Sequence, residues 1–304
     1  MSTININECL KELSIRPKII RRINNYVIIE TIDKNYLIKR KGIDKEKVFS
    51  YLDSFDCSFY LPYLELINDK YELYIFYDDR ENDYSKGIEL INALSKIHLK
   101  TMSEVLYTSE ITKEIYDKQL SKIESLKKYY FDLQDFLDES TILRPDYIFL
   151  LKNISKFYRI LDLSRKKLDD WYKREHTSYR ESFQIQNVSF SNFIYNGDCY
   201  FIDFDQSSQS FIIDDIVSFY HNELLNCDIE PFLKKYFDLI SIDSSELDLF
   251  YSYIAIPDKI ELGNNCYENC VYSSNAVRYI DKTIAYILEK DKENEETNQQ
   301  EFKE

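Results

Sequence analysis

FQIQNVSFSNFIYNGDCYFIDFD, residues 183–205, is the stretch of sequence that decides the fold. At its centre is Asn196-Gly197, and both residue types tolerate the positive φ that a type I′ turn requires. The residues on either side, 193–195 and 199–202, are aromatic or β-branched apart from one cysteine, which suits β-strands. We therefore predict a β-hairpin that is closed by a two-residue turn.

The predicted hairpin places two oxygen-bearing side chains at its open end. With a two-residue turn, Asn192 lies opposite Phe201, and Asp203 shares the face of Phe201 because strand side chains alternate with period two. Diagonal neighbours on one face are roughly 7–8 Å apart. Amide and carboxylate oxygens suit Mg²⁺, which takes few protein oxygens together with phosphate oxygens. The sequence thus predicts that Asn192 and Asp203 hold Mg²⁺; the alternative is a surface hairpin that merely ends in polar residues.

An asparagine, a hairpin and then Ile-Asp-Phe-Asp, residues 202–205, resemble the catalytic segment of the protein-kinase-like superfamily. The segment is most similar to the aminoglycoside phosphotransferase and choline kinase type, and within it to bacterial spore-coat CotS-like proteins. The resemblance implies a two-lobed α+β fold, with a small antiparallel β-sheet N-lobe that has one helix and a larger, mainly helical C-lobe. It also implies ATP and Mg²⁺ as cofactors. By this resemblance Asn192 is the catalytic-loop asparagine, Asp203 is the metal aspartate, and Asp215 is the acidic residue that begins the next helix.

One position departs from the pattern of this superfamily. The superfamily has His-Gly-Asp or a similar string, whose aspartate stands five residues before the asparagine. Counting back from Asn192 places Asn187 at the position of the catalytic aspartate and Ile185 at the position of the histidine. An amide cannot accept the hydroxyl proton of a substrate as a carboxylate can. The catalytic loop is therefore degenerate, and we expect phosphotransfer to be weakened or lost.

Residues 1–77 have the pattern of the nucleotide-side N-lobe. A helix is predicted from Lys45 to about residue 54, and strands are predicted at 26–30, 36–39, 64–67 and 71–77. The resemblance implies that Lys39, at the end of a strand, contacts the nucleotide phosphates and that Glu46, on the helix, is its partner. No glycine precedes Lys39, so the glycine-rich phosphate loop of kinases is missing, and backbone amides approach phosphates less closely without it.

Residues 78–288 have the helical pattern that is expected of the C-lobe around the hairpin. A long helix is predicted from Pro145 to about residue 171. The string that ends at His98 resembles the Leu-Ala-x-Leu-His helix of the superfamily, and we expect His98 to be a hydrogen-bonded structural residue; His176, in a polar loop, is assigned no role. Residues 289–304 are mostly Glu, Lys, Asn and Gln, which predicts a disordered acidic tail.

The composition of the 304-residue chain excludes several classes of protein. A formal net charge of −15 argues against nucleic acid as a partner. No apolar run approaches the roughly 18 residues of a membrane span, and the N-terminus lacks the basic and apolar regions of a signal peptide. We therefore expect a cytoplasmic protein without a membrane partner. Six scattered cysteines are too few for a disulfide scaffold, and for Cys266 and Cys270 reduced thiols are favoured over half of a metal site.

Three functions remain open on the sequence alone. The first is a kinase-like protein with lost or weakened phosphotransfer that serves as a binding or assembly component, with spore-coat proteins as partners and the spore coat as its location. The second is an active small-molecule kinase that phosphorylates a hydroxyl of a cationic amine or amino sugar, with Glu181 as the nearest upstream carboxylate to replace the base. The third is an α+β scaffold without a ligand.

Overall fold

The computed structural model divides into two compact units. The sheet unit comprises Met1–Ser103, Glu181–Ser218 and Phe232–Ile240, and the helical unit comprises Glu104–Arg180, Phe219–Pro231 and Ser241–Glu304. Within these bounds the structure describes residues 4–13, 16–23, 26–42, 44–79, 83–106, 108–141, 144–174 and 177–301, of which 23, 83 and 294–301 are described by their backbone alone. His176 lies outside the described residues. The sheet unit contains both the expected N-lobe and the expected hairpin.

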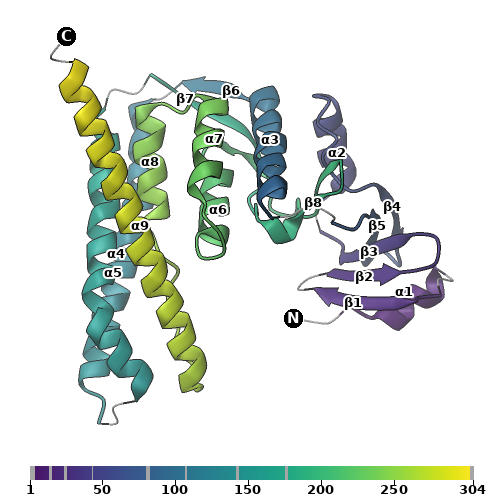
Figure 1. The fold of residues 1–304 in the computed structure, drawn as a ribbon, viewed down its shortest axis with the longest axis horizontal. Helices are drawn as coiled ribbons and strands as arrows, with labels where there is room; N and C mark the ends of the chain where they lie inside the picture. The colour runs from purple at the N-terminus through teal and green to yellow at the C-terminus, as the bar shows by residue number, and fades with distance from the viewer. Residues whose placement is uncertain are drawn as a thin grey trace. The chain divides into compact units, whose positions relative to one another are not determined.

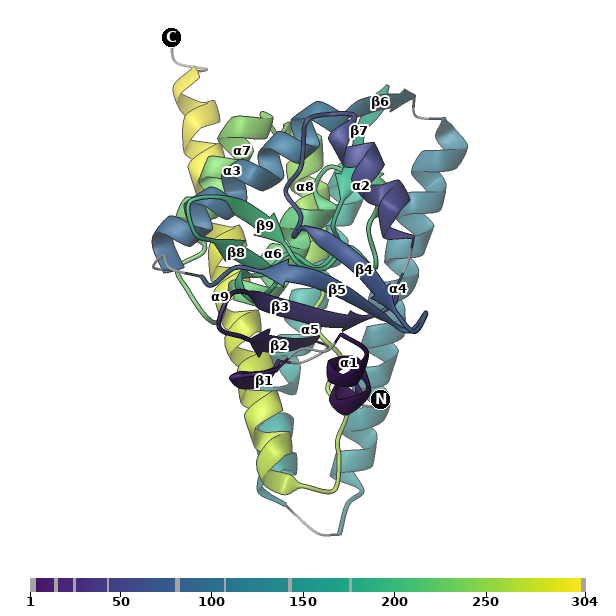
Figure 2. The ribbon, with the colours of Figure 1, turned by 90° about the vertical axis from the view of Figure 1, so that its right-hand side faces the viewer.

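A five-stranded antiparallel sheet forms the core of the sheet unit (Figure 2). In spatial order its strands are β1 (Ile19–Ile23), β2 (Tyr26–Glu30), β3 (Asn35–Arg40), β5 (Tyr71–Phe76) and β4 (Tyr63–Ile67). The helix α2 (Lys45–Asp53) connects β3 to β4 in the chain. The four strands and the helix that the sequence predicted are confirmed. β1 was not predicted, because Arg21 and Arg22 interrupt its apolar run and its Ile19 and Ile20 are exposed.

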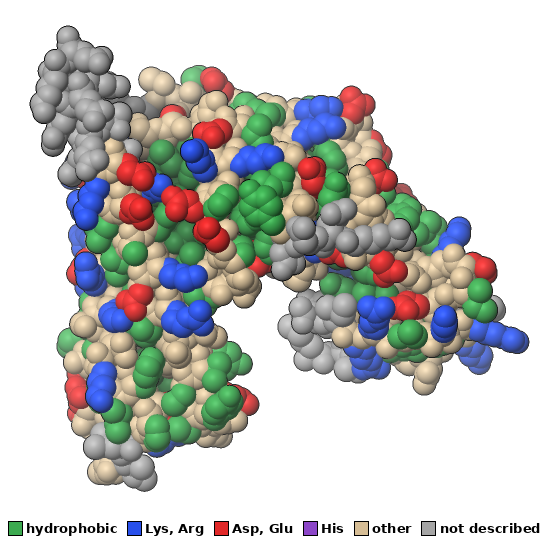
Figure 3. Space-filling model, in the orientation of Figure 1, with side chains coloured by type: hydrophobic (Ala, Val, Ile, Leu, Met, Phe, Trp, Pro, Cys, Tyr) green, Lys and Arg blue, Asp and Glu red, His purple; other side chains and the backbone are tan. Residues whose placement is uncertain are grey.

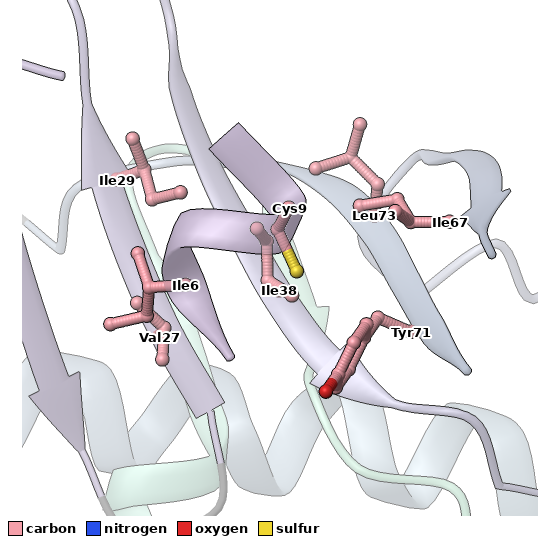
Figure 4. Close-up of a cluster of buried hydrophobic side chains, with 8 residues drawn as sticks. All are labelled: Ile6, Cys9, Val27, Ile29, Ile38, Ile67, Tyr71 and Leu73. Atoms are coloured by element: carbon pink, nitrogen blue, oxygen red, sulfur yellow. The ribbon is translucent and has the colours of Figure 1, made fainter. Parts of the chain in front are cut away.

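One face of this sheet is covered by the short helix α1 (Ile6–Glu12), as Figure 4 shows. The helix is capped by Asn5, whose side chain accepts a hydrogen bond from the backbone N–H of Glu8. The buried side chains that meet under α1 are Ile6, Cys9, Val27, Ile29, Ile38, Ile67, Tyr71 and Leu73. Burial of each larger apolar side chain stabilises the fold by about 1.5–3 kcal/mol. Because strand side chains alternate, Lys39 and its cross-strand partner Glu72 lie on the opposite face of the sheet.

The predicted hairpin is present, but its turn is one residue longer than predicted. β8 (Phe193–Tyr195) pairs antiparallel with β9 (Cys199–Phe201), which leaves a three-residue connection. Gly197, in its middle, has a φ of 110°. The side chain of Asn196 accepts a hydrogen bond from the backbone N–H of Asp198 at 3.2 Å. This local bond makes Asp198 part of the turn, whereas the predicted two-residue turn had Asp198 paired with Tyr195 across the strands.

The longer turn changes which residues face each other. Asn192, the last residue of the short 3-10 helix η1 (Phe190–Asn192), accepts a hydrogen bond at its carbonyl from the N–H of Ile202 at 2.9 Å. Asn192 therefore lies beside Ile202, and the prediction that it faces Phe201 was wrong. Period-two alternation then no longer places Asn192 and Asp203 on one face of the hairpin. Their proximity has to come from other contacts.

Several further elements adjoin the hairpin segment. The sheet unit also contains α3 (Asp83–Thr101) and β10 (Ser208–Phe211). Four elements continue from one unit into the other, namely β6 (Ser103–Leu106), β7 (Ser178–Gln184), α6 (Asp214–Glu223) and α7 (Glu230–Ile240). β10 pairs antiparallel with the last four residues of β7, from Phe211 opposite Glu181 to Ser208 opposite Gln184. The end of β7 leads directly into the loop that carries Asn187.

The helical unit is built around α5 (Pro145–Tyr172), which packs against α4 (Ser109–Asp138), α8 (Ser244–Ile254) and α9 (Cys266–Glu301) (Figure 1). α5 begins at its proline as predicted, because proline lacks the N–H that a first helical turn leaves unpaired. The buried side chains of α5 recur at helical spacing and end at Trp171. None of the helices in the described part of the chain is both long and apolar enough to span a bilayer.

α9 extends into the segment for which the sequence predicted disorder from residue 289. The helix continues to Glu301. Lys290 forms ion pairs with Glu230 at 2.6 Å and with Glu293, three residues further along α9, at 3.0 Å. The run of Glu, Lys, Asn and Gln that suggested disorder contains good helix formers, and pairs at this spacing support an exposed helix.

Candidate functional site

Lys39 joins the sheet to the segment that follows the hairpin. Its side chain is buried on the sheet face opposite α1. Its ammonium group forms one ion pair with Asp203 Oδ1 and another, at 2.6 Å, with Asp205 Oδ2. Lys39 and Asp203, which the sequence assigned to one nucleotide and metal site, are therefore in direct contact although 164 residues separate them in the chain.

Glu46 is not the partner of Lys39, and this prediction was wrong. The buried residues of α2 are Lys45, Phe49 and Leu52, which share one helical face. Glu46 is rotated by about 100° from Lys45 around the helix axis, and its side chain is exposed. The prediction followed the helix-borne glutamate of the superfamily, whereas the hydrophobic pattern of α2 turns the preceding residue inward.

Lys45 takes this inward position and is a site residue that the sequence analysis missed. Its ammonium group forms an ion pair with Asp205 Oδ1, so the two carboxylate oxygens of Asp205 are shared between Lys45 and Lys39. Burial alone would raise the pKa of Asp205, but the hydrogen bonds from the two lysines hold this pKa below its ordinary value. Gly42 packs directly on Asp205, because a Cβ at that position would overlap the carboxylate. The helical spacing of Lys45 with Phe49 was the signal that could have identified it.

Asn187 connects the other two predicted site residues. Its side-chain amide donates to Asp203 Oδ2 across 3.5 Å, and its backbone carbonyl accepts a hydrogen bond from the side chain of Asn192 at 3.1 Å. The structure thus brings Asn187, Asn192 and Asp203 together. It does so through the loop that precedes η1, whereas the sequence argument relied on strand faces.

Asp215 holds the loop that carries Asn187. Its buried carboxylate accepts hydrogen bonds from the backbone N–H groups of Ile185 at 2.8 Å and Gln186 at 2.6 Å. Gln186 has a φ of 67°, a left-handed conformation that is uncommon for a residue other than glycine. Asp215 lies in the first turn of α6, as the resemblance implied, and it stabilises this backbone conformation.

His98 has the structural role that the sequence predicted. It is fully buried in α3, with Nε2 3.0 Å from Asp215 Oδ2 and Nδ1 2.7 Å from the hydroxyl of Tyr236. The Tyr236 hydroxyl also donates to the carbonyl of Ile212 at 2.6 Å. Both ring nitrogens of His98 are therefore engaged, Nε2 with Asp215 and Nδ1 with Tyr236, which leaves neither nitrogen for proton transfer to a substrate.

Several solved phosphotransferase structures share this arrangement of elements. An aminoglycoside phosphotransferase from Alicyclobacillus acidocaldarius is similar with a TM-score of 0.61 and 9% sequence identity, over 95% of this chain and 98% of that one. The AMP-bound spectinomycin phosphotransferase has a TM-score of 0.62 and 14% identity, over 92% and 97% of the two chains. Its complex with ADP and spectinomycin has a TM-score of 0.54 and 14% identity, over 86% and 88%. The chain has the two-lobed protein-kinase-like fold.

This kinase-like assignment rests on structure, because neither a protein-family model nor a curated protein matches the sequence. At 9–14% identity the similarity establishes the fold and leaves the activity open. What the protein does therefore has to be argued from the side chains of its own site.

The residues of this kinase-like site fit a single divalent cation. Asp203 Oδ2 and the amide oxygen of Asn192 are hard oxygen donors of the kind that Mg²⁺ takes together with phosphate oxygens. Asp203 Oδ1 and both oxygens of Asp205 are paired with lysines. In the described ranges, no group of three or more His, Cys, Asp or Glu side chains could hold a metal ion by itself. Cys266 and Cys270 are free thiols.

The position that the resemblance assigned to the catalytic base carries an amide side chain. Asn187 stands there, and Glu181, the carboxylate considered as its replacement, lies on β7 opposite Phe211. Among the residues that the structure describes, no hydrogen bond joins Glu181 to Asn187 or to Asp203. The described site therefore contains the buried ammonium groups of Lys39 and Lys45, and the residue that the resemblance aligned with the base is an amide.

Proposed function

We propose that this kinase-like protein binds a nucleotide and has weak or no phosphotransfer activity. The observation that carries the proposal is Asn187, which stands at the base position and donates its amide to Asp203. An amide presents an N–H donor there and has no basic group for a substrate proton. Phosphoryl transfer depends mainly on positioning and charge neutralisation, so a low residual rate is compatible with this site.

Nucleotide binding is supported by Lys39 and by the structural similarity. Lys39 lies one residue before the end of β3 and contacts Asp203, so its ammonium group is beside the proposed metal ligand, where nucleotide phosphates would bind. The spectinomycin phosphotransferase structures contain AMP or ADP. ATP is therefore the first nucleotide to test, with Mg²⁺ held by Asp203 and Asn192.

The biological role proposed with this activity is that of a binding or assembly component. A chain that binds nucleotide and transfers little phosphate acts through the conformation or the surface that the nucleotide stabilises. The likeness of residues 183–205 to spore-coat CotS-like proteins supports spore-coat proteins as partners, with the cytoplasm or the spore coat as the location.

Thermal unfolding with millimolar ATP and Mg²⁺ tests nucleotide binding. We expect the nucleotide to raise the Tm of the wild type, because a ligand that binds only the folded state stabilises it by about 2.7 kcal/mol at 100 times its Kd. Asp203→Ala should lose this shift. Asp198→Ala, the same substitution at the exposed hairpin turn, should keep it. A wild-type Tm that does not respond to any nucleotide contradicts the proposal.

A pocket in the helical unit favours a second candidate function, the phosphorylation of a cationic amine or amino sugar. Its volume is about 380 Å³, and it is lined by Tyr272, Tyr279, Asp258 and Glu261 among others. Figure 3 shows hydrophobic side chains over the end of this unit at which α9 begins, and α9 exposes Tyr272. Burial lowers the pKa of His221, another lining residue, so its ring is neutral at pH 7. Carboxylates and aromatic faces together bind ammonium groups.

Transfer of the γ-phosphate of ATP to amino sugars and choline-like amines separates the two functions. An active kinase should phosphorylate one of these acceptors, and Asp258→Asn should raise its KM. Lys259→Met, a charge change on the same pocket wall, should not weaken the binding of a cationic acceptor. Nucleotide binding without transfer to any acceptor supports the first function.

A further inference from the structure

The acidic pair Asp203 and Asp205 is neutralised inside the chain by two lysines. Lys39 contacts both carboxylates, and Lys45 contacts Asp205. The lysine side chains are 6% and 4% exposed, whereas the two carboxylates are 23% and 30% exposed. The ammonium groups therefore lie beneath an acidic pair that solvent reaches, and each of them requires a carboxylate because an unpaired buried charge is strongly unfavourable.

This arrangement changes the charge that the site offers to a metal ion. If Lys39 were paired with a helix glutamate, as the resemblance implied, both aspartates would be left uncompensated and would attract divalent cations. In protein kinases two Mg²⁺ ions bind at the metal aspartate and the catalytic-loop asparagine. Here the inward residue of α2 is Lys45, which adds a positive charge and balances the pair. A divalent cation at Asp205 would have to displace an ammonium group or lie beside it.

We propose that Lys45 takes the place of a divalent cation beside Asp205, so that this site binds divalent metal weakly and accepts nucleotide phosphates without requiring a metal there. Metal affinity at carboxylate sites depends on the number of ligand charges, and the Lys45 ion pair removes one of them. Nucleotide phosphates are repelled by uncompensated carboxylates, and Lys45 removes that repulsion as a metal ion does. The statement about phosphates rests on the proposed function; the statement about metal does not.

Titration of the nucleotide-free protein with Mn²⁺, followed by electron paramagnetic resonance, tests directly whether Lys45 weakens the binding of a divalent cation beside Asp205. Wild type should bind Mn²⁺ weakly. Lys45→Met frees one oxygen of Asp205 and removes the repelling charge, so we expect its Mn²⁺ affinity to rise about tenfold or more. The double variant Lys45→Met/Asp205→Asn should lose this gain, because Asp205 is the ligand that Lys45→Met releases.

Two further variants control for the loss of a lysine and for the change in side-chain shape. Lys47→Met removes a lysine from the same helix, where Lys47 is exposed and forms an ion pair with Asp44, and it should leave Mn²⁺ affinity unchanged. Lys45→Arg keeps the charge and should also show no gain. An equal Mn²⁺ affinity in wild type and Lys45→Met overturns the proposal, and so does an equal gain in Lys47→Met.

A folding defect in Lys45→Met also gives a decisive result. Removing Lys45 leaves Asp205 with one ammonium partner, so the variant is expected to be less stable than wild type. The proposal predicts that millimolar Mn²⁺ restores its cooperative thermal unfolding, that EDTA reverses the effect, and that the wild-type Tm does not respond to Mn²⁺. A destabilised variant that no divalent metal restores overturns the proposal.

Nucleotide binding in the presence of EDTA tests whether phosphates are accepted without a metal ion beside Asp205. ATP should still raise the Tm of wild type when EDTA is present, whereas Lys45→Met should respond to ATP only when Mg²⁺ is present. If EDTA abolishes the ATP-induced rise in the wild-type Tm, the proposal that phosphates bind without a metal ion beside Asp205 is overturned. A wild type that responds to no nucleotide under either condition contradicts the proposed function instead, and the Mn²⁺ titrations then stand alone.

Discussion

Asn187 donates its side-chain amide to Asp203 Oδ2 across 3.5 Å. The resemblance aligned Asn187 with a catalytic carboxylate. The loop that carries Asn187 is anchored by Asp215, which accepts hydrogen bonds from the two backbone N–H groups that precede Asn187. Phosphate binding and proton acceptance would thus depend on different residues of this chain. Under the proposed function, Lys39 and Asp203 serve nucleotide binding, and residue 187 decides whether a base is present.

Asn187→Asp is expected to raise phosphotransfer. The substitution places a carboxylate at the base position without changing the length of the side chain, and general base catalysis typically contributes 10²–10⁴-fold. Because the new carboxylate lies close to Asp203, part of this gain is lost to repulsion between like charges, so we expect about a tenfold or greater increase. Release of ADP and transfer of labelled γ-phosphate measure it.

The matched control for this prediction is Asn196→Asp. It makes the same chemical change in the hairpin turn, where Asn196 contacts Asp198, and it should leave the rate of phosphotransfer unchanged. A rate for Asn187→Asp that is equal to or lower than that of wild type contradicts the placement of residue 187 at the base position.

The sheet and the hairpin were predictable because their signals are local. Val27 and Ile29 alternate with residues of the other face, and Asn196-Gly197 marks a turn whatever the rest of the chain does. The length of the turn was not predictable, because it depends on whether Asp198 pairs across the strands or bonds to Asn196. One residue of register was enough to invalidate the argument that placed Asn192 beside Asp203, although the loop brings them together.

The composition of the candidate site was predictable only in part. Lys39 and Asp203 were identified through the resemblance, and their contact follows from the fold. Glu46 was chosen by analogy, and the helical pattern of Lys45, Phe49 and Leu52 would have corrected that choice. The pairing of Lys45 with Asp205 was beyond reach, because 160 residues separate them and no local pattern relates them.

The stability of the protein should depend on pH through Asp205. The lysines hold the pKa of Asp205 in the folded state below its ordinary value of 3.8, so the ion pairs stabilise the fold fully above that pH. This contribution is lost as the pH falls from about 3.8 through the folded-state value. Asp205→Asn should therefore lower the free energy of unfolding by about 1.5–3 kcal/mol at pH 6 and by less at pH 3. Urea unfolding at the two pH values measures the difference.

Asp198→Asn is the control for this pH series, because Asp198 is exposed in the hairpin turn and contacts no lysine among the described residues. It should change the free energy of unfolding by less than about 0.5 kcal/mol at either pH. A cost of Asp205→Asn that is the same at pH 6 and pH 3 contradicts the role assigned to the two ion pairs.

Asp215→Ala should destabilise the sheet unit far more than any other single substitution in the loop region. Asp215 is fully buried, accepts hydrogen bonds from Ile185 and Gln186, and contacts His98, so its loss leaves several buried polar groups without a partner. Breaking a buried charged contact of this kind typically costs about 3–5 kcal/mol. Urea unfolding followed by circular dichroism measures this cost.

The adjacent residue provides the control for Asp215. Asp214 also lies in the first turn of α6, but it is only partly buried and accepts a hydrogen bond from the hydroxyl of Ser210. Asp214→Ala should cost about 0.5–2 kcal/mol, as the loss of a helix-capping contact does. If Asp215→Ala does not fold, Asp215→Asn, which keeps one acceptor oxygen for the Ile185 and Gln186 N–H groups, should fold with an intermediate loss. Equal costs at 214 and 215 contradict the assignment of Asp215 as the residue that holds the Asn187 loop in place.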